Sequence, residues 1–190
     1  MSIFDGLSQT LFSACGVEPT PLEPGTVLST LDWMEQSAVG ACVSQSPSGF
    51  YILLAFHSVG LAMIVGVMMV VSMRLLGVAK GISVTALPRL VTIGWWGFWI
   101  NAISGVTLFF GEANKMFGNT TFRWKLFLIF VGMTSTYIMN KTVLKPAAAG
   151  DLSKINSGSA RGQAVFSIMI WLAVIITGRM IAYITEQGGG

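Results

Sequence analysis

The sequence is poor in the residues that catalysis requires. Only one histidine occurs among the 190 residues, and only 10% of the residues are charged. There is no HExxH zinc motif, no CxxC pair and no glycine-rich phosphate loop. Between Glu35 and Asp151 the single acidic residue is Glu112, so that stretch lacks a carboxylate pair for acid–base catalysis. The sequence therefore predicts a protein that is not an enzyme, because hydrolysis and phosphoryl transfer would lack their usual groups.

Positive charge is absent from residues 1–73, which contain no lysine or arginine. A secretory signal peptide begins with a basic region, so this absence argues against one. Most of the cations lie in two later segments that each join two apolar runs. Seven of the eleven lysines and arginines are there: Arg74, Lys80, Arg89, Lys141, Lys145, Lys154 and Arg161. Since cations collect in cytoplasmic loops, this pattern predicts a bacterial inner-membrane protein with both termini in the periplasm.

Apolar residues dominate the composition. Hydrophobic residues make up 53% of the chain and the mean hydropathy is +0.72, values typical of a protein embedded in membrane lipid. Four apolar runs predict transmembrane helices at about 50–74, 89–111, 124–143 and 163–185. The net charge of +3 follows from the loop cations, and no basic surface interleaved with aromatic residues indicates a nucleic-acid partner.

The predicted helix 89–111 carries a stripe of small and polar residues on one face. Small side chains let transmembrane helices approach closely, and Asn101 in this stripe is expected to form an interhelical hydrogen bond. With short connecting loops, this indicates an antiparallel four-helix transmembrane domain over residues 48–186. The residues of the stripe, most of them small, are Gly94, Gly97, Asn101, Ser104, Gly105 and Leu108.

The residues before the first apolar run predict two further segments. Residues 1–28 are expected to form an irregular periplasmic arm, because VEPTPLEPG at 17–25 contains three prolines and a glycine. Residues 29–45 are expected to form one interfacial amphipathic helix, with a capping-box spacing from Ser29 to Asp32. The fold class is therefore an all-α membrane protein with an N-terminal interfacial helix.

Both cysteines, Cys15 and Cys42, fall within these N-terminal segments. In an oxidising periplasm they would form one disulfide. Two small buried apolar side chains are the alternative, and the sequence leaves both interpretations open.

His57 is the candidate functional residue of the predicted membrane helices. An ionisable side chain within the membrane is by default a functional-site hypothesis. Three roles are open to His57. It would fix helix packing through a hydrogen bond to a Ser, a Thr or a backbone carbonyl of another helix, or it would ligate haem or another redox group. The third role is binding of a proton, a quinone or a metal ion. The metal would be copper(I), which thioethers bind, although core filling is the other use of the methionines. The methionines near His57 in the same helix are Met63, Met68, Met69 and Met73.

A haem b site would draw on several helices. Gly60 leaves a notch one turn from His57, which suits a neighbouring helix or a flat cofactor. His57 would supply one axial ligand, and Met133 or Met180 would supply the other. Cations near the outer boundary would pair with the haem propionates. These cations are Arg179, Arg123 and Lys125.

Several short motifs resemble a group of bacterial four-helix inner-membrane proteins that form a family of unknown function. The motifs are W-x-E at 33–35, FHxxGLAxxxG at 56–66, RLLG at 74–77, WWGF at 95–98, GVTLFF at 105–110 and FRWK at 122–125. The resemblance covers roughly residues 30–186, with a more distant likeness to copper-resistance D and cytochrome b561-type bundles. The histidines that hold two haems in b561-type bundles are reduced here to His57, so the resemblance does not extend to a two-haem carrier.

Taken together, these features predict a non-catalytic accessory or structural subunit of a larger membrane complex, surrounded by lipid and bound to protein partners. The alternative is a redox subunit with a single b-haem or a quinone linked to His57. A small transporter fits less well, because no two helices show aligned Pro or Gly breaks. A copper-handling protein also fits less well, because the methionines are scattered around the helix of His57, which favours core filling.

Overall fold

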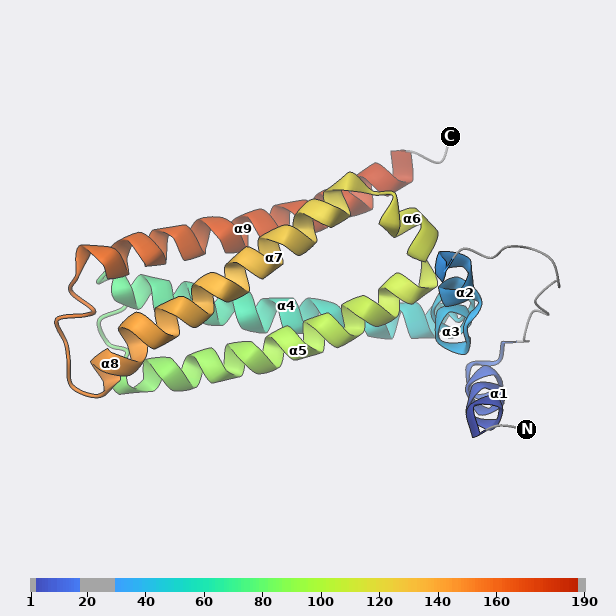
Figure 1. Ribbon diagram of the computed structural model, residues 1–190, viewed down its shortest axis with the longest axis horizontal. Helices are drawn as coiled ribbons and strands as arrows, with labels where there is room; N and C mark the ends of the chain where they lie inside the picture. The colour runs from blue at the N-terminus through green and yellow to red at the C-terminus, as the bar shows by residue number, and fades with distance from the viewer. Residues whose placement is uncertain (1–2, 18–29, 188–190) are drawn as a thin grey trace. The chain divides into compact units, whose positions relative to one another are not determined.

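The computed structural model describes residues 3–17 and 30–187, and these ranges contain helices and no β-strand. Four helices are long and apolar enough to cross a membrane, as the apolar runs predicted. They are α4 (Pro47–Leu75), α5 (Leu87–Gly111), α7 (Thr120–Met139) and α9 (Gly158–Gln187), labelled in Figure 1. The fold is all-helical, and four such helices indicate a multi-pass membrane protein.

Two of these helices begin earlier than their apolar runs predicted, because polar residues cap them. Ser157 Oγ accepts a hydrogen bond from the Ala160 backbone N–H at 3.1 Å, so α9 begins at Gly158. Asn119 Oδ1 accepts from the Thr121 N–H at 2.9 Å and caps α7 in the same way. Hydropathy alone locates the lipid-embedded part of a helix and misses these polar first turns.

The chain divides into two compact units. The first contains the residues up to Val59 and Trp99–Gly118, and the second contains Gly60–Phe98 and the chain from Asn119 onward. Each unit is described separately below.

The second unit is the four-helix bundle, because residues of all four long helices share one buried core. Trp171 of α9 is only 1% exposed, and Leu87 of α5 is completely buried. Large residues of α4, α7 and the segment after α7 fill the rest of this core. They include Met68, Val71, Met139 and Leu144. Short elements join the long helices: the 3-10 helix η1 (Val84–Ala86), the π-helix η2 (Asn140–Leu144) and α8 (Lys145–Ala148).

Within this bundle α7 and α9 lie side by side and antiparallel (Figure 1). A Cβ atom at Gly132 of α7 would lie 3.0 Å from Ile170 Cγ2 and 3.3 Å from Trp171 Cζ2 of α9. A Cβ atom at Gly178 would lie 3.6 Å from Lys125 Cε. The close approach at Gly132 agrees with the expectation that small residues let transmembrane helices approach closely.

The first unit contains α1 (Ile3–Cys15), α2 (Thr30–Gln36), α3 (Ala38–Gln45), α6 (Ala113–Phe117) and the adjoining ends of α4 and α5. Two of the sequence predictions are corrected here. The arm at 1–28 is helical over Ile3–Cys15, where the chain has no proline. The proline-rich residues 18–28 and Ser29 of the expected capping box lie outside the described residues.

The second correction concerns the interfacial helix, which is divided at Ser37 into α2 and α3. Ser37 is extended, with φ −61° and ψ 156°, and its Oγ accepts from the Gly40 N–H at 3.1 Å. The serine therefore ends one helix and caps the next. Periodicity detected helical character over the whole segment but did not detect the cap inside it.

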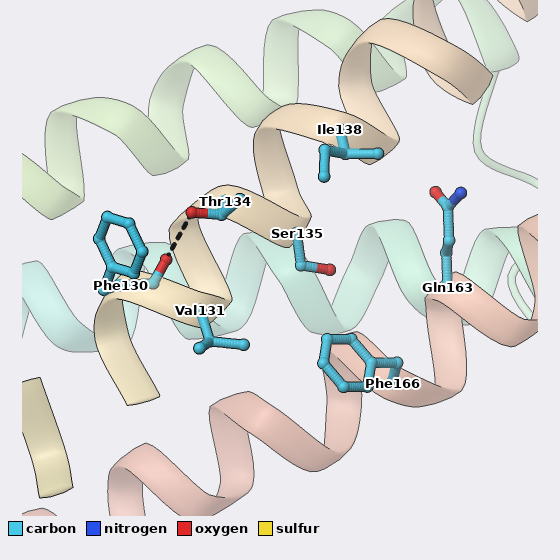
Figure 2. A pocket seen from close by; sticks show the side chains of 7 residues that line it. All are labelled: Phe130, Val131, Thr134, Ser135, Ile138, Gln163 and Phe166. Carbon is cyan, nitrogen blue, oxygen red and sulfur yellow. Dashed lines mark hydrogen bonds between the residues drawn. The ribbon is translucent and has the colours of Figure 1, made fainter. Parts of the chain in front are cut away.

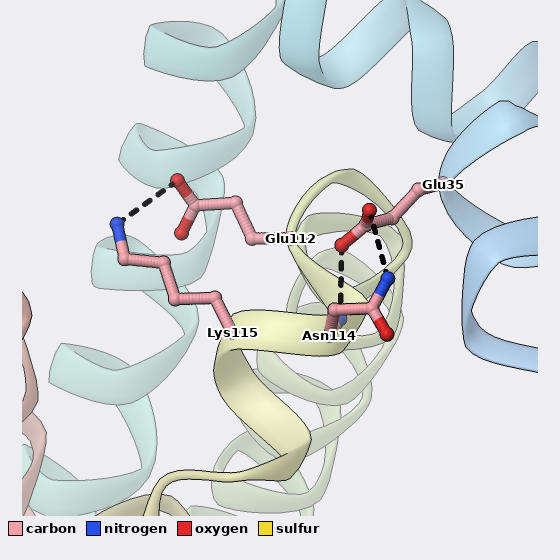
Figure 3. Close-up of polar contacts among 4 residues, drawn as sticks. All are labelled: Glu35, Glu112, Asn114 and Lys115. Atoms are coloured by element: carbon pink, nitrogen blue, oxygen red, sulfur yellow. Dashed lines mark hydrogen bonds and ion pairs between the residues drawn. The ribbon is translucent and has the colours of Figure 1, made fainter.

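A disulfide joins α1 to α3 through Cys15 and Cys42, whose Cα atoms are 5.5 Å apart. Polar contacts join α2 to α6 (Figure 3). The Glu35 carboxylate accepts from the Asn114 backbone N–H at 2.9 Å and from Asn114 Nδ2 at 3.1 Å, and Asp32 accepts from the same Nδ2 at 2.7 Å. Glu35 thus supplies from another helix the cap that α6 needs at its first turn.

Candidate functional site

The environment of His57 is built by a reciprocal pair of hydrogen bonds between α4 and α5 in the first unit. His57 Nδ1 lies 3.0 Å from the backbone oxygen of Asn101, and Asn101 Nδ2 donates to the backbone oxygen of His57 at 2.8 Å. Each residue therefore bonds the backbone of the other. We call this arrangement the His57–Asn101 clamp. The interhelical hydrogen bond expected for Asn101 is therefore present. His57 also bonds a backbone carbonyl of another helix, which is the contact expected if the histidine has a packing role.

Small residues of α5 make room for the imidazole ring. Ser104 Oγ lies 3.3 Å from His57 Nδ1, and it donates to the Ile100 backbone oxygen at 2.6 Å. A Cβ atom at Gly105 would lie only 2.9 Å from His57 Cε1. Asn101 and Ser104 are 7% and 4% exposed. The small-residue stripe is therefore the surface that receives the histidine.

The clamp also selects the tautomer of His57. A backbone carbonyl oxygen can only accept, so the bond to Asn101 requires that Nδ1 carry the proton. In the neutral ring Nε2 then holds the lone pair. A histidine that donates Nδ1–H to a backbone carbonyl is the form that commonly ligates a metal through Nε2. The clamp is thus compatible with a packing role and with a ligand role.

The notch predicted beside His57 is filled by a helix within the second unit. A Cβ atom at Gly97 of α5 would lie 2.9 Å from the Gly60 backbone oxygen and 2.6 Å from Met63 Cβ. Gly60 is buried there. Of the two uses considered for the notch, it therefore accommodates the backbone of α5.

The other residues considered for a haem or copper site belong to the second unit. Met133 is 8% exposed and packs in the bundle core, whereas Met180 is 47% exposed on α9. Arg179 is also exposed on α9. Met68 is buried in the core and Met73 is exposed, as the scattered positions of the methionines suggested. Among the residues that the structure describes, no three His, Cys, Asp or Glu side chains gather where they could hold a metal ion.

A groove that the sequence did not predict lies between α7 and α9 in the second unit (Figure 2). Its volume is about 340 Å³. Gln163 Oε1 is buried at the groove and accepts no hydrogen bond within the described part of the chain. The residues that line it are Phe130, Val131, Thr134, Ser135, Ile138, Gln163 and Phe166. We call it the α7–α9 groove. No motif indicated it, because Gln163 lay at the boundary between a predicted loop and a predicted helix.

Comparison with known proteins places the chain in a family. The model of the family of unknown function DUF6644 matches residues 30–184. The chain belongs to this family. No curated protein and no solved structure matches it. The match covers all four membrane-length helices except the last residues of α9, and the likeness to copper-resistance D and cytochrome b561-type bundles stays a prediction.

Replacing Asn101 with alanine should lower the free energy of unfolding by about 1 kcal/mol, since interhelical hydrogen bonds in membranes contribute roughly 0.6–1.7 kcal/mol. Unfolding in detergent micelles, followed by circular dichroism, would measure the change. Thr107→Val is the matched control, because Thr107 Oγ1 donates to Ile103 of its own helix at 2.9 Å. An Asn101→Ala variant no less stable than the Thr107→Val variant would contradict the energetic role of the clamp.

Proposed function

We propose that this protein is a non-catalytic subunit of a larger membrane assembly, and that a transmembrane helix of a partner subunit packs into the α7–α9 groove. The observation that supports this proposal is the groove itself. Its walls are side chains of two membrane-length helices, and it contains a buried oxygen, Gln163 Oε1, with no donor among the described residues.

The chemistry of the groove favours a protein occupant over a lipid chain. Phe130, Ile138 and Phe166 are exposed at its walls and would contact either one. An acyl chain carries no hydrogen-bond donor, so it would leave the Gln163 oxygen unsatisfied. A buried acceptor without a donor costs roughly 1–3 kcal/mol. A helix that carries a Ser, Thr, Asn or Gln side chain would fill the groove and bring a donor to its wall, which Gln163 would meet by rotating its amide toward the groove.

The proposal includes an orientation in the bacterial inner membrane. The seven loop cations belong to the connections between α4 and α5 and between α7 and α9, or to the helix ends beside them, as expected of the cytoplasmic side. The disulfide between Cys15 and Cys42 is expected of an oxidising compartment. Both features support an N-terminus and a C-terminus in the periplasm.

The test is the mass of the protein extracted in mild detergent from its own host. The monomer has a mass of 20.3 kDa. We expect a larger complex that contains a second polypeptide, and we expect Phe166→Arg to dissociate it, because a charge in the groove would be buried against the partner. Met169→Arg, at an exposed position on the same helix outside the groove, is the matched control.

Three results would contradict the proposal. If the protein is a monomer in every mild detergent and in native nanodiscs, it is not a subunit of an assembly. If the complex contains only this chain, the groove binds a second copy and not a different partner subunit. If the two arginine variants dissociate the complex equally, the groove is not part of the interface.

A second candidate function, a redox subunit with a single b-haem, is favoured by the tautomer of His57. The Nδ1–H bond to Asn101 corresponds to the tautomer in which histidines commonly ligate iron through Nε2. A bound haem would supply one-electron transfer. On this chain His57 would be the residue that holds the haem iron.

The same preparation decides between the two candidates. Its visible spectrum, oxidised and then reduced with dithionite, would show a Soret band and reduced α and β bands if haem is bound to His57. These bands would be lost in His57→Ala and retained in Asn114→Ala. A featureless spectrum from haem-replete cells is the result expected of a non-catalytic subunit.

A further inference from the structure

A basic pocket lies in the second unit, between the end of α4 and the start of α9. Its volume is about 470 Å³. Arg74, Lys80 and Arg161 contribute positive charge to its lining, and Asn156 adds an amide. Leucine and isoleucine side chains, including Leu76 and Ile155, form the apolar part of the lining. The pocket therefore combines cations with apolar surface.

The cations of this pocket lack the partners that usually neutralise such groups. Within the described ranges, no carboxylate forms an ion pair with Arg74, Lys80 or Arg161. The loops around them are also poor in acid, since Asp151 is the single acidic residue between Glu112 and Glu186. A positive-inside bias explains why cations occur on this side. It does not explain why three of them line one cavity.

Local contacts hold two sides of the pocket in place. Arg74 Nε donates to the Ile82 backbone oxygen at 2.7 Å, which fixes the guanidinium and leaves its terminal nitrogens as donors. Ser157 caps α9 between Asn156 and Arg161, so the N-terminus of this long helix lies at the lining. The partial positive charge of a helix N-terminus adds to that of the side chains.

We propose that this pocket binds the phosphodiester headgroup of an anionic membrane lipid. Arginine and lysine bind phosphate oxygens through charge-assisted hydrogen bonds. The apolar residues of the lining would contact the glycerol and the first methylenes of a lipid, which a soluble phosphate does not have. Basic pockets between transmembrane helices on the cytoplasmic side are known to bind headgroups such as that of cardiolipin. The site is independent of the α7–α9 groove.

The test is a titration of the full-length protein with tetraoleoyl cardiolipin, followed by native mass spectrometry, with dioleoyl-phosphatidylcholine as the neutral lipid. We expect saturable binding of cardiolipin to the wild type. Lys80→Gln with Arg161→Gln should weaken it about 100-fold, since each lost charge-assisted bond accounts for about tenfold. Arg74 is left unchanged because it also bonds Ile82.

The matched control is Lys145→Gln with Lys154→Gln, which removes the same charge from exposed positions of the same unit outside the pocket. It should change the affinity by no more than about threefold, because salt screens distant charges. If the two double variants lose cardiolipin affinity equally, the lipid binds to a diffuse positive surface and not to this pocket. If inorganic phosphate binds in a way that depends on Lys80 and Arg161 and cardiolipin does not bind, the ligand is a soluble phosphate compound and the lipid proposal is wrong. Circular dichroism would verify that both variants fold.

Discussion

Replacing Gly97 with leucine should destabilise the four-helix bundle by about 3 kcal/mol, the upper end of the usual cost of overpacking. The reason is the backbone of α4. A Cβ atom at Gly97 would lie 2.9 Å from the Gly60 oxygen and 3.0 Å from the Ile64 nitrogen. Backbone atoms within a helix cannot rotate away as a flexible side chain can, so the two helices would have to separate.

Alanine at Gly97 provides a graded version of the same test. It adds only the Cβ atom, so it should cost about 1 kcal/mol or more and still allow the protein to fold. Gly66→Ala on α4 is the matched control, because no atom lies within 4 Å of the added Cβ. That variant should be neutral or more stable by up to about 1 kcal/mol, since alanine favours helices over glycine.

Thermal unfolding in detergent would rank the three variants. The expected order of stability is Gly66→Ala, then Gly97→Ala, then Gly97→Leu. If Gly97→Ala matched Gly66→Ala, the close approach of α4 and α5 in the second unit would be incorrect, and the notch at Gly60 would again be open to a cofactor.

Apolar run length was sufficient to predict the four long helices, because a helix in lipid must satisfy its backbone internally and present apolar side chains over its whole span. The same logic predicted a close approach of another helix at the small residue Gly97. It did not predict helix ends. These depend on single polar residues, such as Ser157 before α9 and Ser37 between α2 and α3, which hydropathy averages out.

The candidate sites were predictable only where one residue was unusual by itself. His57 was evident as the single histidine, and its partner Asn101 was evident as a polar residue in a stripe of small ones. The basic pocket was missed, because Arg74 and Arg161 are far apart in sequence and each is explained locally by the positive-inside rule. No motif in the loop before α9 indicated a site, although Ile155 and Asn156 line the pocket.

Replacing Cys42 with serine should destabilise the first unit by about 3–4 kcal/mol, the largest effect expected of a single polar substitution in this chain. The disulfide closes a loop with a sequence separation of 27 residues. In the chain-entropy account of disulfides, opening a loop of this length costs about that much. The cost should appear mainly as release of α1, which contacts α3, so limited proteolysis should cleave α1 of the variant much faster than α1 of the wild type.

Trapping thiols at the moment of lysis tests the same bond together with the proposed topology. Maleimide-polyethylene glycol should not label the wild type before reduction and should add two labels after it, because both cysteines are in the bridge. Ser13→Ala on α1, which removes a hydroxyl bonded to Thr10 of its own helix, is the control for proteolysis and should behave as the wild type. Two reactive thiols in freshly lysed wild-type cells would contradict the bridge. That result would also place the N-terminal helices in a reducing compartment, and the orientation proposed from the loop cations would have to be reversed.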